Sequence, residues 1–142
     1  MELHLYRTRV HRDTTDGHLY INGQYICDTA ERTAVSLPCG DYLVTIAQSA
    51  PFGRLMPLIR PLTSTLDAPS APRHRGRRPR MPAPPQFIFG NGTYTLPRGD
   101  IIVGEHCCRG LVIHSKETFD HLFERLRKHT PCPDPIVLYI RR

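Results

Sequence analysis

The residues best suited to chemistry lie close together in the second half of the chain. Two histidines flank a pair of adjacent cysteines there, and an aspartate follows a glycine a few positions earlier. Such a set points to nucleophilic catalysis, because an imidazole that accepts a thiol proton raises the fraction of reactive thiolate. The candidate catalytic residues are Asp100, His106, Cys107, Cys108 and His114.

The spacing of the cysteines and histidines limits what they can do together. Adjacent side chains on a strand point to opposite faces, so only one of Cys107 and Cys108 can share a site with His106 or His114. The cysteines form no C-x-x-C pair, and the histidines form no H-x-x-x-H pair on a helix. We therefore predict no bound metal ion and no cofactor.

Asp100 has two interpretations. Paired with Glu105 or Asp41 it would suit acid–base catalysis, which needs two carboxylates in different surroundings. A carboxylate that caps backbone N–H groups after Gly99 is the simpler interpretation, because aspartate commonly does this in turns.

Composition and cysteine usage indicate the compartment. The five cysteines are an odd number at spacings that match no disulfide framework, which predicts reduced thiols, each in the role of a small hydrophobic residue. No stretch approaches the roughly 18 apolar residues that a membrane span requires. The first seven residues alternate and lack the apolar block of a secretory signal. We expect a cytoplasmic protein with no membrane partner.

The net charge of +6 is concentrated in a Pro/Arg-rich stretch at about residues 61–85. This composition buries too little apolar surface to offset the entropy of ordering, so we predict a mobile or disordered insertion within a single domain spanning residues 1–142. The stretch can neutralise phosphates, but it lacks aromatic residues that would stack on bases. A solvated loop without a partner is the simpler interpretation, and non-specific contact with nucleic acid or an acidic protein surface is the alternative. The candidate nucleic-acid contacts in this stretch are Arg73, Arg75, Arg77, Arg78 and Arg80.

Hydrophobic patterning predicts strands through the first half of the chain. Period-two alternation begins at Leu3 and Leu5. Asn22-Gly23, flanked by β-branched and aromatic residues, predicts a hairpin with a type I′ turn over residues 18–27. A turn at residues 37–41 leads into a strand at 42–47. Pro57 places the next extended segment, 54–59, at a sheet edge.

The second half adds strands and one helix. Residues 86–89, 101–103 and 110–113 read as extended segments. Ser115 is expected to cap an amphipathic helix, with Glu117 placed to meet the helix dipole. A stripe of apolar residues follows at helical spacing, and residues 136–140 read as a buried terminal strand. The predicted fold class is α+β: mainly antiparallel β, one amphipathic helix in the C-terminal region and a terminal strand. The stripe consists of Phe119, Leu122, Phe123 and Leu126.

Several stretches carry a further signal through their order and spacing: Gly17–Thr29, Leu37–Tyr42, Phe52–Leu58, Gly99–Gly104 and Ser115–Leu126. Together they resemble a family of small bacterial and phage proteins catalogued as domain of unknown function 5675. That family carries His-Ala-Gly-Asn before a Gly-Cys pair. The layout is similar to that of L,D-transpeptidases, which act on peptidoglycan stem peptides through a cysteine nucleophile.

This chain departs from the family pattern at both reactive positions. Phe89 stands where the resemblance implies a histidine, and Asp100 stands where it implies the cysteine. A phenyl ring accepts no proton, and an aspartate is a poor substitute for a thiolate in acyl transfer. The resemblance therefore implies a degenerate site without transpeptidase activity.

Three functions remain open. The preferred one is a non-catalytic domain of phage or mobile-element biology that binds a partner protein or a cell-wall ligand. The second is an L,D-transpeptidase-like enzyme whose nucleophile has moved to Cys107 or Cys108, with His106 or His114 as the base. The third is a nucleic-acid-associated accessory protein that uses the Arg-rich stretch. Whether Phe89, Asp100, His106 and His114 line one pocket separates the first two.

Overall fold

The computed structural model describes residues 1–62, 83–93, 96 and 98–142, and it confirms the α+β class. Most strand pairs are antiparallel; β1–β9 and β6–β7 are parallel. A 3₁₀ turn covers Thr33–Val35 and helix α1 covers Ser115–His129. The strands are β1 (Glu2–Val10), β2 (Thr14–Ile21), β3 (Gln24–Arg32), β4 (Gly40–Ser49), β5 (Arg54–Pro61), β6 (Phe87–Ile88), β7 (Ile101–Cys108), β8 (Leu111–Ile113) and β9 (Ile136–Arg141).

The strands form one strongly curved sheet in the order β5-β4-β9-β1-β2-β3-β7-β6, with β8 paired to β7. β5 begins this order, as predicted from Pro57, which cannot donate to a ladder. The other end of the sheet curls back toward β5. Leu58 forms a bridge with Gln86, and the Ile59 N–H donates to the Pro85 carbonyl at 2.7 Å. The sheet therefore approaches a closed barrel.

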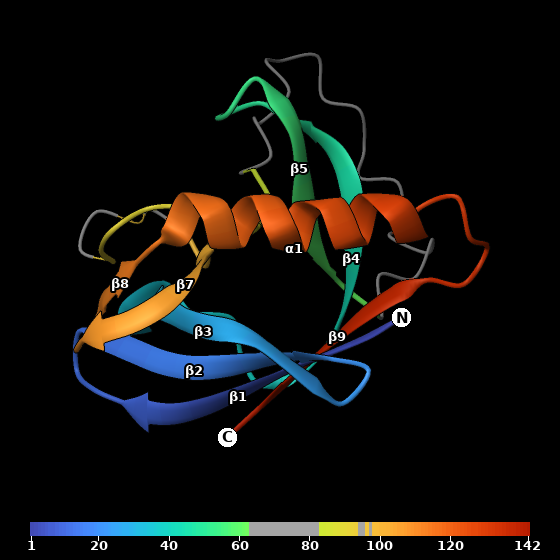
Figure 1. Ribbon diagram of the computed structural model, residues 1–142. Helices are drawn as coiled ribbons and strands as arrows, with labels where there is room; N and C mark the ends of the chain where they lie inside the picture. Colours follow the sequence, from blue (N-terminus) through green and yellow to red (C-terminus); the bar gives the residue numbers. More distant parts are fainter. Residues whose placement is uncertain (63–82, 94–95, 97) are drawn as a thin grey trace, which may run out of the picture.

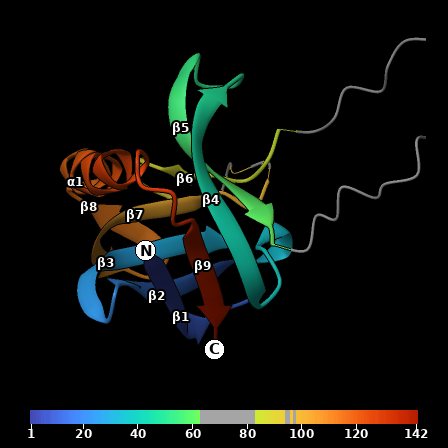
Figure 2. The same cartoon turned by 90° about the vertical axis from the view of Figure 1, so that its right-hand side faces the viewer.

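One hydrophobic core joins the sheet to the helix. β4 and β5 stand upright beside α1, and β1, β2 and β3 lie below it (Figures 1 and 2). Three residues of the predicted stripe, Phe119, Leu122 and Leu126, are fully buried, and Phe123 packs against the core from its edge. Ile21, which precedes the Asn22-Gly23 turn, belongs to the same core cluster. The hairpin and the helix thus share one core, as the patterning predicted.

Two turns depend on positive φ angles. Asn22 and Gly23 have φ of 48° and 84°, which confirms the predicted type I′ turn between β2 and β3. Gly110, between β7 and β8, has φ of 72°, and a Cβ there would lie 2.5 Å from Thr14 Cγ2. Glycine at position 110 therefore lets the β7–β8 turn pack directly on β2.

The predicted N-cap of the helix is wrong. His114, in the left-handed region with φ of 52°, occupies the cap position and makes no side-chain capping hydrogen bond. Ser115 is the first helical residue and is buried. Its hydroxyl donates to the Val103 carbonyl and accepts from the Gly90 N–H. Ser115 therefore ties the helix to β7 and to the turn after β6 instead of capping its own helix.

The cysteines, the Pro/Arg-rich insertion and the absence of a membrane span were the other expectations from the sequence. Of the five cysteines, Cys27 alone is buried as a small hydrophobe; Cys39, Cys107, Cys108 and Cys132 are exposed. Most of the predicted insertion, residues 63–82, lies outside the described residues, as do the five candidate arginines. Pro61 and Pro85, at its two ends, belong to the barrel. Within the described residues, no helix has the length and apolarity to cross a bilayer.

Candidate binding face and histidine pocket

Alternating side chains on neighbouring strands place a set of aromatic rings on the outer face of the sheet. On β1, Leu3 and Leu5 are fully buried, so His4 and Tyr6 point outward. The same alternation on β2 and β9 turns the residues next to Leu19, Leu138 and Ile140 outward. We call this set the aromatic face. It comprises His4, Tyr6, His18, Tyr20, Tyr25 and Tyr139.

Strand register aligns these rings across the sheet. His4 is paired with Tyr139 on β9 and with Tyr20 on β2. Tyr20 is in turn paired with Tyr25 on β3. Four neighbouring strands therefore contribute one ring each to a continuous row. Tyr6 and His18, which are paired with each other, begin a second row beside it.

The rings contact one another yet stay accessible. His4 stacks on Tyr139 with ring centroids 4.8 Å apart. Tyr20 meets Tyr6 and Tyr25 edge-on, at 5.7 and 5.8 Å. Tyr6 is 43% exposed and Tyr25 is 50% exposed. Mutual contacts of this kind hold the rings in place, and they leave Tyr6 and Tyr25 exposed to a ligand while the other rings are half-buried.

A pocket of about 230 Å³ opens beside the aromatic face. We call it the histidine pocket; its lining residues are Thr8, Arg9, Asp16, Gly17, His18 and His106. His106 Nε2 lies 3.1 Å from Asp16 Oδ2, and His18 Nδ1 lies 2.7 Å from Asp28 Oδ1. Two imidazoles are thus each held by a carboxylate. His18 belongs both to the pocket and to the aromatic face.

Asp28 connects the two histidines. Its Oδ2 accepts the backbone N–H of His106 at 2.8 Å, while its Oδ1 accepts the Tyr25 hydroxyl at 2.8 Å as well as contacting His18. Burial favours the neutral acid, but these hydrogen bonds outweigh it and lower the pKa of Asp28. Burial, followed by the hydrogen bond to Asp28, raises the pKa of Tyr25. Asp28 is therefore a carboxylate and Tyr25 a neutral phenol at neutral pH.

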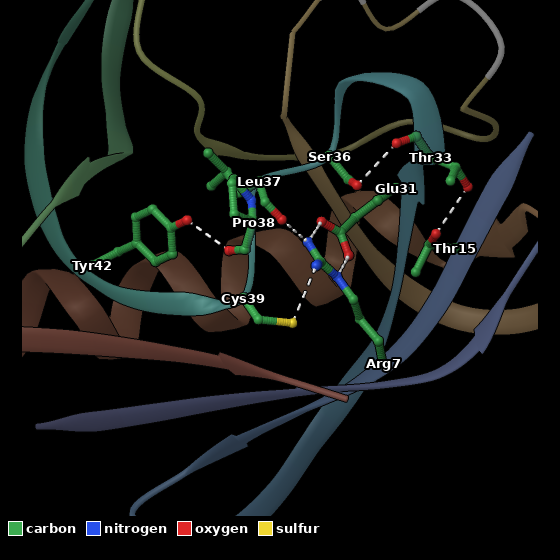
Figure 3. Close-up of polar contacts among 9 residues, drawn as sticks. All are labelled: Arg7, Thr15, Glu31, Thr33, Ser36, Leu37, Pro38, Cys39 and Tyr42. Atoms are coloured by element: carbon green, nitrogen blue, oxygen red, sulfur yellow. Dashed lines mark hydrogen bonds and ion pairs between the residues drawn. The ribbon is translucent and has the colours of Figure 1, made fainter.

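A second polar cluster lies inside the barrel end and supports the fold. Figure 3 shows the Arg7 guanidinium between the Glu31 carboxylate, the Leu37 carbonyl and the Cys39 thiol. Both side chains of the ion pair are buried, with Arg7 Nη2 2.8 Å from Glu31 Oε1. Burial lowers the pKa of Arg7, but the hydrogen bond and the charge of Glu31 outweigh this effect, so the pKa of Arg7 is raised. The guanidinium holds the chain after β3 across the end of the barrel.

Asp100 lies in the interior, away from the histidine pocket. Its Oδ1 accepts the Gln86 N–H and the Arg98 Nε–H, both at 3.1 Å. Burial raises its pKa, against the opposing effects of Arg98 and Gln86. Asp100 therefore caps a backbone N–H group, but that group belongs to the strand region before β6 and not to the turn after Gly99.

The remaining sequence candidates do not converge on one site. Exposed His114 pairs with Glu105 at 3.1 Å in a separate depression beside α1. Phe89 packs on Phe119, with ring centroids 5.3 Å apart. Of the four residues that the degenerate-site interpretation would bring together, His106 alone lines the histidine pocket.

The adjacent cysteines lie at the exposed end of β7. The register shift between His106 and Cys108 makes a bulge at Cys107 in the β7–β8 pair. Among the described residues, no hydrogen bond joins either thiol to His106 or His114. The described residues also contain no group of three or more potential metal ligands.

Sequence reasoning missed the aromatic face, although part of its signal was present. The motifs His4-x-Tyr6 and His18-x-Tyr20 each repeat aromatic residues with a period of two. Tyr139 joins this face because β9 pairs with β1. These strands lie at opposite ends of the sequence, so no local pattern predicts their pairing.

No family model, no curated protein and no solved structure matches the chain.

Proposed function

We propose that the protein is a binding domain that holds single-stranded nucleic acid on the aromatic face. The observation that carries this proposal is the row of rings contributed by four adjacent strands, because unpaired bases stack on exposed aromatic side chains. Each such contact contributes roughly 1–3 kcal/mol and tolerates any base. The preferred binding role and the nucleic-acid role are thereby joined on one surface.

Charge supports a polyanionic ligand. Most of the net charge of +6 belongs to the Arg-rich stretch at about residues 61–85, which would supply contacts to phosphates next to the barrel. Arg9 is exposed beside the rings, and the Arg141 guanidinium lies 5.5 Å from the Tyr139 ring centroid. Arg141 also contacts Asp41 at 2.7 Å, so part of its charge is already compensated. In this proposal, stacking on the aromatic face makes binding specific for single-stranded nucleic acid, and positive charge adds affinity.

The resemblance to peptidoglycan-processing proteins favours a cell-wall ligand instead. Stem peptides offer few planar rings for the aromatic face to stack on, so we rank this second. A transpeptidase with a relocated cysteine is an alternative proposal. Among the described residues no hydrogen bond from a thiol to His106 or His114 supports it. Incubation with a carbapenem followed by intact-protein mass spectrometry tests it, and an adduct on Cys107 or Cys108 would establish it.

Fluorescence anisotropy with a labelled single-stranded oligonucleotide tests the proposed function. Tyr6→Ala and Tyr25→Ala should each weaken binding by roughly 5- to 150-fold, the range that corresponds to the loss of one stacked base. His121→Ala, at an exposed position on α1, is the matched control and should leave the affinity unchanged. Equal affinity in all variants, or equal affinity for duplex and single strand, contradicts the proposal. Purified peptidoglycan serves as the competing ligand.

A further inference from the structure

The histidine pocket contains two imidazole–carboxylate pairs that the binding of nucleic acid alone does not require. Each imidazole uses one ring nitrogen on a carboxylate: Nδ1 of His18 contacts Asp28 and Nε2 of His106 contacts Asp16. Among the described residues, the other nitrogen of each ring has no hydrogen-bond partner. Both rings line the same pocket, together with the exposed Arg9. Two oriented imidazoles with free nitrogens on one pocket are the elements of paired general acid–base catalysis.

We propose that the histidine pocket cleaves single-stranded RNA bound on the aromatic face, an inference that rests on the proposed function. His18 connects the two surfaces, because its ring lines the pocket and also meets Tyr25 edge-on at 5.8 Å. A base stacked beside His18 brings its own ribose and phosphate to the pocket. Arg9 supplies a positive charge for the phosphate there.

The cleavage step needs only the strand and the two imidazoles. The free nitrogen of His18 accepts the proton of the ribose 2′-hydroxyl, and the 2′-oxygen forms a bond to the adjacent phosphorus. The bond from phosphorus to the 5′-oxygen breaks with its electron pair, and His106 donates a proton to that oxygen. The products are a 2′,3′-cyclic phosphate and a free 5′-hydroxyl. Water then returns a proton to His106 and takes one from His18.

The position of each imidazole assigns its role. The His18 ring meets Tyr25 edge-on at 5.8 Å, so it lies next to the aromatic face, where the ribose of a stacked base enters the pocket. His18 is therefore the base that accepts the 2′-hydroxyl proton. His106, which lines the same pocket, is the acid. Asp28 and Asp16 hold the two rings in place.

The test compares an RNA oligonucleotide with its 2′-deoxy counterpart of the same sequence, in EDTA to silence contaminating metal-dependent nucleases. RNA should be cut to products ending in a 2′,3′-cyclic phosphate, identified by mass spectrometry, while the deoxy strand binds and stays intact. His18→Gln and His106→Gln should each slow cleavage at least about 100-fold, the usual contribution of one acid or base. Binding of the deoxy strand by both variants is measured in parallel, which separates a loss of cleavage from a loss of binding.

Matched controls separate the possible outcomes. His121→Gln, purified identically, should cleave at the wild-type rate. A copurifying ribonuclease would cleave equally in the His18→Gln and His106→Gln preparations, so the loss of cleavage in those two variants excludes it. Binding without cleavage overturns the cleavage proposal and leaves the proposed function standing. Failure to bind either strand overturns both. Cleavage that persists in either pocket variant, or that ends without a cyclic phosphate, overturns the cleavage proposal.

The pH–rate profile of the wild-type protein provides a test that needs no variant. One imidazole must be neutral and the other protonated, so the rate should rise and then fall with pH. A rate that only rises with pH overturns the proposal.

Discussion

At the scale of single residues, two carboxylates show opposite effects of the fold. Hydrogen bonds lower the pKa of Asp28 despite its burial, and burial raises the pKa of Asp100 despite Arg98 and the Gln86 N–H. Both start from an ordinary value of 3.8. For Asp100 the folded state binds the proton more tightly, so its contribution to stability falls as pH rises from 3.8 through the folded pKa. Asp28 behaves in the opposite way, and its contribution is lost as pH falls.

These signs predict the pH dependence of two conservative variants. We expect the free energy of unfolding of Asp100→Asn, relative to wild type, to increase from about pH 3 to about pH 7. The matched variant Asp28→Asn should show the opposite trend over the same range. Urea titrations at a series of pH values measure both. Parallel trends would show that the two carboxylates are not perturbed in opposite directions.

The Arg7–Glu31 pair gives a second prediction at this scale. Both side chains are buried, at 4% and 0% exposure, so removal of one leaves an unpaired charge in the interior. Glu31→Gln should lower the free energy of unfolding by roughly 3–5 kcal/mol. Asp120→Asn, which breaks the exposed pair between Lys116 and Asp120, should cost less than about 1 kcal/mol. Equal costs would mean that the barrel end does not depend on the buried pair.

At the scale of elements, helix α1 is held by its apolar stripe. Leu122 is fully buried, whereas its neighbour His121 is exposed. Leu122→Ala should therefore lower the free energy of unfolding by roughly 2–5 kcal/mol, and His121→Ala should leave it nearly unchanged. Chemical denaturation of both variants measures the difference. A stability of Leu122→Ala within experimental error of wild type would show that α1 does not dock as described.

Local patterns predicted the elements better than their contacts. The period of the apolar residues was sufficient to predict α1, and Asn22-Gly23 was sufficient to predict the β2–β3 hairpin, because both signals depend on residues close together in the sequence. Ser115 was misassigned because its partners, Val103 and Gly90, come from other elements. The histidine pocket escaped prediction for the same reason: Asp16 and His106 are 90 residues apart in sequence.

At the scale of the whole molecule, backbone hydrogen bonds hold both flanks of residues 63–82 on the barrel. The Leu62 N–H donates to the Asp41 carbonyl at 3.2 Å, and the Pro85 carbonyl accepts from Ile59. The composition between these flanks offers little apolar surface to a core. We therefore expect the fold to depend on the flanks, and we propose that the five arginines between them supply charge toward a polyanion.

Replacement of residues 66–82 by a Gly/Ser linker of the same length separates these contributions. The unfolding midpoint should stay within about 4 °C of wild type, because no buried contact is expected to be lost and the length of the loop is unchanged. Affinity for a single-stranded oligonucleotide should fall, and its dependence on salt should flatten as fewer counterions are released. The additional loss of affinity caused by Tyr25→Ala should be the same in both backgrounds, because stacking on the aromatic face does not involve the replaced segment.

A large fall in the unfolding midpoint would show that the segment is part of the fold. An unchanged salt dependence would assign the phosphate contacts to arginines of the barrel itself.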